Sequence, residues 1–223
     1  MSTTRDAIVD AAVQLAEETS WEEVRLYNVA ERLDVPLTAV QAQFREKEEI
    51  ADAWFDRPDH ALVAAASDPA VQALPTTEKL HCLIMTWLDA QAAHQRVVRE
   101  MIKGKLEAGH VHVQLPAVLR ISRTVQWLRE AAHRDAAGAM RGLEETVLTS
   151  IFVTTFVSWL NEDTHDFRRT RARLSRLLHG AAWMARWVPG YHSPQARGAL
   201  PAPPEGALRP GNAAADESTD ARA

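Results

Sequence analysis

The stretch LYNVAERLDVPLTAVQAQF, residues 26–44, decides the fold of this 223-residue chain. Its apolar residues recur every three or four positions, as on one face of a helix, and the segment DVP (34–36) interrupts them. Proline suits the first position of a helix, where no backbone N–H is required. The spacing therefore predicts two short helices, over about 26–33 and 37–44, joined by a tight turn.

The sequence around this stretch is helical in pattern on both sides. An amphipathic helix is expected over about 5–19, and a further one begins near 46. Two prolines in 67–77 break the pattern before it resumes. Five more helices follow, over about 77–92, 94–107, 113–135, 139–161 and 166–188. The sequence thus predicts an all-α fold of about nine helices.

Composition divides the chain into three parts. Residues 1–57 form a helix-turn-helix headpiece, and residues 58–188 form a helical body for ligand binding and dimerisation. Residues 189–223 hold six prolines and four glycines but few large apolar side chains. Such a composition buries too little surface to offset the entropy of ordering, so we predict a disordered tail.

The headpiece sequence RDAIVDAAVQLAEETSWEEVRLYNVAERLDVPLTAVQAQFREKEEIADAWFDR (5–57) resembles the TetR family of transcriptional regulators. The likeness lies in the first amphipathic helix, the aromatic Trp21, and the apolar positions Val29, Val40 and Phe44. The resemblance implies a regulator that binds operator DNA, responds to a small molecule held in the body, and dimerises through its last two helices.

The resemblance also implies which residues meet DNA. The second helix of the turn motif would enter the major groove. Base edges or phosphates would be contacted by Thr38, Gln41 and Gln43, and phosphates by Arg45 and Lys47. The alternative interpretation is that these polar residues are only solvated, on a headpiece that no longer binds DNA.

Charge keeps both interpretations open. The whole chain has a net charge of −5, and residues 1–57 carry six Lys and Arg against 13 Asp and Glu. This sign opposes nonspecific attraction to phosphate. The expected reading helix contains no Lys or Arg, and Asp34 occupies the turn position where the family usually has glycine.

A second resemblance concerns residues 143–181, which are similar to the lipid-binding accessory proteins of ubiquinone biosynthesis. The common pattern is an apolar helix, an acidic turn, here NEDTHDF (161–167), and an amphipathic helix. This similarity implies an alternative function, that of a lipid- or isoprenoid-binding accessory protein with a vestigial headpiece.

Apolar stripes on the last two helices predict a homodimer with two-fold symmetry. The residues that we expect at its interface are Phe152, Trp159, Leu174, Leu177 and Leu178. Five arginines near the start of the last helix fit either an anionic membrane surface or a solvated face, and we favour the solvated face.

Large flexible and aromatic side chains in the body predict a pocket for an unidentified apolar small molecule. The candidate lining residues are Met85, Trp87, Met101, Trp127 and Phe156. The same residues at helical spacing would equally serve as plain core.

Several other function classes have no support in the sequence. Cys82 is the only cysteine, so an intrachain disulfide is impossible. His110 and His112 lack acidic or thiolate partners at metal-site spacing, and no phosphate loop or nucleophile motif is found. We therefore predict a cytoplasmic protein that is not an enzyme, with no cofactor, no metal and no stable membrane insertion.

Overall fold

The computed structural model describes the backbone of residues 4–106 and 111–188, and the side chains of that part except in 105–119. It contains ten α-helices and a short 3-10 helix, Ala92–His94. The α-helices are α1 (Arg5–Glu18), α2 (Leu26–Arg32), α3 (Leu37–Gln41), α4 (Lys47–Ala66), α5 (Pro69–Gln72), α6 (Thr76–Asp89), α7 (Gln95–Leu106), α8 (Val111–Ala131), α9 (Gly138–Leu160) and α10 (Arg168–Ala185). The predicted all-α fold is confirmed, and the additional helix, α5, lies in the segment 67–77 that the sequence marks as a break.

The turn between α2 and α3 is a complete Schellman cap. The backbone N–H of Val35 donates to the carbonyl of Ala30 at 3.0 Å, and that of Asp34 donates to the carbonyl of Glu31 at 3.1 Å. Asp34 has a φ of 52°, the left-handed conformation that this cap requires and that aspartate tolerates better than most residues. The aspartate that replaces glycine therefore keeps the turn.

The helices of the headpiece pack around a small core. Ile8 of α1, Val29 of α2, Val40 of α3 and Phe44 after α3 are all fully buried. Thr4 caps α1 by accepting a hydrogen bond from the backbone N–H of Ala7 at 3.2 Å. These contacts hold α3 on the outside of the headpiece.

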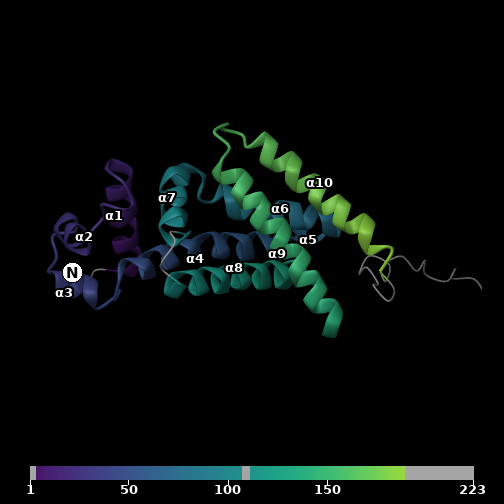
Figure 1. The fold of residues 1–223 in the computed structure, drawn as a ribbon, viewed down its shortest axis with the longest axis horizontal. Coiled ribbons are helices and arrows are strands. Elements are labelled where there is room, and N and C mark those ends of the chain that lie inside the picture. Colours follow the sequence, from purple (N-terminus) through teal and green to yellow (C-terminus); the bar gives the residue numbers. More distant parts are fainter. Residues whose placement is uncertain (1–3, 107–110, 189–223) are drawn as a thin grey trace, which may run out of the picture. The chain divides into compact units, whose positions relative to one another are not determined.

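Helix α4 continues from the headpiece into the body. It runs without interruption through the buried Pro58 and packs against α6 and α8 (Figure 1). The predicted boundary between residues 57 and 58 therefore falls inside one helix that both parts share. Helix α10 packs along α6 and α9. The tail predicted to be disordered, 189–223, lies outside the described residues.

Helix α10 is fixed at its N-terminus by Glu162. The buried carboxylate of Glu162 accepts hydrogen bonds from the backbone N–H groups of Arg169 (2.9 Å) and Thr170 (2.7 Å) and from the Thr164 hydroxyl (2.5 Å). Burial raises the pKa of Glu162, but these hydrogen bonds outweigh it and lower the pKa to about 2. A carboxylate beside the first amides of a helix is stabilising, so the acidic turn serves to start α10.

Helix α9 is the one described helix that is long and apolar enough to cross a membrane, judged by length and composition alone. Within the structure, however, its side chains Phe152, Phe156 and Trp159 are buried against other helices. Burial of this kind is typical of a core helix, which explains why the helix is so apolar.

Candidate nucleic-acid interface

The outer surface of α2 and α3 presents polar and apolar side chains together. Thr38, Gln41 and Gln43 are exposed, as the sequence predicts. Tyr27 on α2 and Leu37 at the start of α3 are 54% and 48% exposed, although both are large. Such side chains on a turn-positioned helix can donate, accept and make apolar contacts at base edges.

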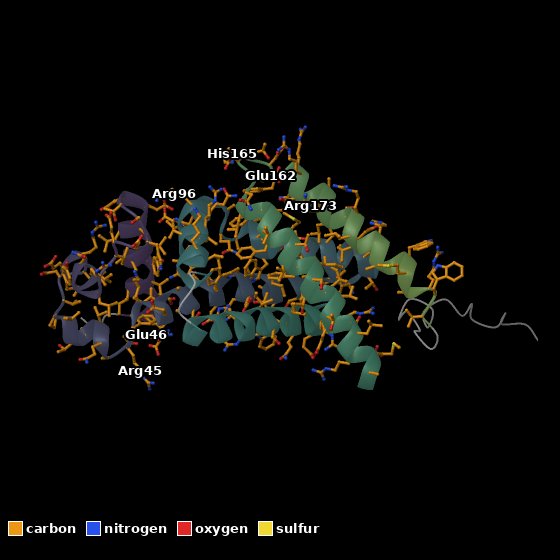
Figure 2. All side chains as sticks on the ribbon, in the orientation of Figure 1. Arg45, Glu46, Arg96, Glu162, His165 and Arg173 are labelled. Carbon is orange, nitrogen blue, oxygen red and sulfur yellow. The ribbon has the colours of Figure 1, made fainter. Side chains whose placement is uncertain are left out.

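Arg45 and Glu46 follow this surface, at the approach to α4. Figure 2 shows the Arg45 side chain extending away from the ribbon. Among the described residues its guanidinium has no hydrogen-bond or ion-pair partner, so it is free for a phosphate. The backbone N–H of Arg45, in contrast, donates to the Glu49 carboxylate at 2.8 Å. Glu49 thus occupies an amide that would otherwise be available to an anion.

Lys47 has a structural contact that the sequence did not reveal. Its Nζ donates to the carbonyls of Trp21 (3.0 Å) and Glu22 (3.3 Å) and lies 5.5 Å from the centre of the Trp21 ring. Burial, together with the nearby charge of Arg25, lowers the pKa of Lys47. The ammonium is engaged inside the headpiece, so the interpretation of Lys47 as a phosphate ligand is corrected.

Arg5 belongs to the same region and was not singled out from the sequence. Its guanidinium donates to the carbonyl of Gln43 at 2.9 Å and lies 4.1 Å above the Phe44 ring. It lines a groove of about 530 Å³ where the headpiece meets α8. The other residues of the groove are Gln41, Ala42, Gln43, Phe44, Arg45, Glu49, Asp52, Ala53, Asp56 and Arg123.

Most cations of the headpiece are already paired. Arg32 forms an ion pair with Glu18, and Arg57 pairs with Asp10, each at 2.5 Å. Arg25 donates to the carbonyls of Glu22 and Val24. Arg45 therefore carries the free positive charge next to α3, and long-range attraction to DNA is weak.

In the body, four of the predicted pocket residues are buried: Met85, Trp87, Met101 and Phe156. The Trp87 ring packs edge-on against Phe152 (5.0 Å) and Phe156 (5.4 Å). Trp127 lies apart from them in exposure, at 47%. The structure thus gives the first four an interior position and places Trp127 at the surface.

A buried polar network joins this aromatic cluster to α4. Asp59 accepts hydrogen bonds from the Trp87 indole (2.8 Å), the Thr124 hydroxyl (2.9 Å) and the Arg120 guanidinium (2.8 Å). Arg120 also contacts Asp56. The helix that begins beside α3 is therefore bonded to α6 and α8 by groups that water does not reach.

The predicted dimer residues lie mainly inside the single chain. Phe152, Trp159, Leu174 and Leu178 are at most 4% exposed, and Leu177 is half-buried. Four of them are core residues here and cannot contact a partner, which corrects the predicted interface. The outer faces of α9 and α10 expose other side chains, which are Leu143, Val157, Trp183, Met184 and Trp187.

Metal binding receives no candidate from the described part of the chain. In that part no group of three or more His, Cys, Asp or Glu side chains is arranged to hold a metal ion. His110 lies outside the described residues, as does the side chain of His112.

The fold and the exposed α3 define the helix-turn-helix class. Comparison with solved structures is more specific. A TetR transcriptional regulator from Nitrosomonas europaea matches with 50% sequence identity and a TM-score of 0.72, covering 80% of this chain and 98% of that one. The chain belongs to the TetR family of transcriptional regulators.

More distant structures share the fold. A TetR regulator from Rhodococcus sp. RHA1 is 18% identical, with a TM-score of 0.61, and covers 78% of this chain and 92% of its own. Thermus thermophilus FadR, a repressor solved with lauroyl-CoA, is also 18% identical, with a TM-score of 0.55, and covers 79% and 92%. No protein-family model and no curated protein matches the sequence.

These matches favour a regulator over the lipid-binding accessory protein that residues 143–181 resemble. The acidic turn behind that resemblance has a role within the chain, because Glu162 caps α10.

Proposed function

We propose that this protein is a ligand-responsive regulator that acts in the cytoplasm and binds operator DNA as a homodimer. The observation that carries the proposal is the exposed surface of α3, held outward by the Schellman cap at Asp34. Thr38, Gln41 and Gln43 would read base edges, and Arg45 would bind a phosphate.

The response to a ligand would be a shift between two arrangements of the headpieces. A ligand changes DNA affinity only if it binds one arrangement better than the other. The hydrogen bond between Trp87 and Asp59 supports a physical route. An apolar molecule that moves Trp87 would break a bond to α4, the helix that follows the DNA-reading surface. Met85, Met101 and Phe156 are the candidate neighbours of that molecule.

The test is titration of DNA from upstream of the gene with the purified protein at several salt concentrations. We expect Gln41→Ala to weaken specific binding by about 1–3 kcal/mol. Arg45→Gln should lower the salt dependence by the equivalent of about one phosphate contact.

The matched control is Arg168→Gln, which removes an exposed arginine on α10, far from α3 along the chain; it should leave both quantities unchanged. Binding that Gln41→Ala and Arg45→Gln leave intact would contradict this interface. Absence of any specific DNA binding by the folded protein would refute the proposed function.

A further inference from the structure

The outer face of α10 has two chemically different halves. Arg169, Arg173 and Arg176 are exposed in the N-terminal half, and Figure 2 shows Arg173 there. In the C-terminal half Trp183 is 56% and Trp187 73% exposed, and their rings contact each other at 6.1 Å. Two neighbouring exposed tryptophans are unusual on a free surface and indicate a contact site.

The exposed arginines have no acidic partners in the described part of the chain. By comparison, Arg171 on the same helix forms a two-fold hydrogen-bonded pair with Asp89, at 2.8 and 2.9 Å. Helix α10 can therefore form ion pairs where an acid is near, and the three outer arginines remain available for other contacts.

Gly180 lies between the two halves. It is exposed, and a Cβ placed on it would meet nothing within 4 Å. Glycine inside a helix destabilises it relative to alanine, and the single chain gains nothing in return here. A glycine at this position has a use if a second helix approaches closely.

We propose that two copies of the chain pair through α10, antiparallel, about a two-fold axis at Gly180. This inference rests on the proposed homodimer and specifies its contact. In this register residue 173 lies opposite residue 187 of the partner, and residue 176 lies opposite residue 184. Each guanidinium group thereby meets an apolar and aromatic half, where cation–π contact is favourable.

A second copy suits this face better than other occupants. A parallel pair would place arginine against arginine, which is repulsive. A helix on a membrane buries a continuous apolar strip, but the strip of α10 that contains Leu174 and Leu178 is already in the core of the chain. The segregation of arginine from tryptophan along the helix matches an antiparallel copy of itself.

Cysteine cross-linking tests the register directly. Because a two-fold axis brings identical residues together, Gly180→Cys in a Cys82→Ser background should form a disulfide-linked dimer on mild oxidation. Gly104→Cys in the same background is the matched control, since Gly104 is also an exposed helical glycine with open surroundings. It should stay monomeric on a non-reducing gel.

Sedimentation of the unmodified full-length chain separates the possible failures. A monomer at micromolar concentration would refute both the proposed homodimer and this contact. A dimer whose Gly180→Cys variant cross-links no faster than Gly104→Cys would refute the register alone.

The chemistry of the contact has its own test. Trp187→Ala should raise the dimer dissociation constant about tenfold, and Arg173→Gln should raise it by a similar factor. The double variant should be little weaker than either single one, since the two residues share one contact. Additive effects, or loss of binding to phosphatidylserine vesicles by Trp187→Ala with the dimer unchanged, would overturn the proposal.

Discussion

At the scale of single residues, Asp34 holds the turn between α2 and α3 in a conformation that costs an L-amino acid energy. Its φ of 52° is free of steric cost only for glycine. We expect Asp34→Gly to raise the free energy of unfolding by up to about 1 kcal/mol, because relief of the left-handed backbone exceeds the added entropy of the unfolded chain. Urea denaturation at neutral pH measures it.

Asp34→Asn provides the control for charge. Asparagine also tolerates the left-handed conformation, so this variant should differ little from the natural protein if the backbone is the cause. A gain of the same size from Asn and from Gly would instead attribute the effect to the removal of one negative charge from the acidic headpiece.

Lys47 and Asp34 mark what single residues reveal from sequence. The turn at Asp34 could be predicted because its signal is local: an apolar period, an interruption and a proline. The role of Lys47 could not, because its partners are backbone carbonyls about 25 positions earlier, and any residue can supply a carbonyl.

At the scale of elements, the start of α10 depends on the ionised Glu162. Its pKa of about 2 lies below the ordinary value of 4.5, so the ionised form is stabilised in the folded state. The stabilisation is fully present above about pH 4.5 and is lost as the pH falls towards 2, with a total of about 3 kcal/mol.

Glu162→Gln tests this dependence. The glutamine variant cannot titrate, so the stability difference between it and the natural protein should be large at pH 6 and shrink towards pH 3, as measured by urea denaturation. Asp163→Asn, at the exposed neighbouring position, should change little at either pH. A difference that stays constant between pH 6 and pH 3 would contradict the cap.

The helices themselves could be predicted, but the surfaces that they bury could not. The apolar stripe of α10 includes Leu174 and Leu178, and a stripe of this period fits a core and a dimer interface equally well. The structure decides in favour of the core, since α6 and α9 cover it. The exposed Trp183 and Trp187, on the other face, carry no sequence signal that separates them from core residues.

At the scale of the whole molecule, the acidic headpiece and the network at Asp59 set how DNA binding is controlled. With Arg25, Arg32 and Arg57 engaged inside the chain, affinity for DNA depends on short-range contacts of α3 and on the dimer. Such a protein is sensitive to the geometry of its headpieces, and α4, bonded to the body through Asp59, sets that geometry.

The unequal exposure of the tryptophans has an optical consequence. All seven lie in the described part of the chain: Trp21, Trp54, Trp87 and Trp159 are buried, and Trp127, Trp183 and Trp187 are exposed. At nanomolar concentration, where subunits separate, acrylamide should quench the emission of three indoles. At micromolar concentration the pairing of α10 should shield two of them and shift their emission to shorter wavelength, while Trp127 stays accessible as an internal reference. Emission that is independent of concentration across the measured dissociation range would show that the α10 face stays open to water.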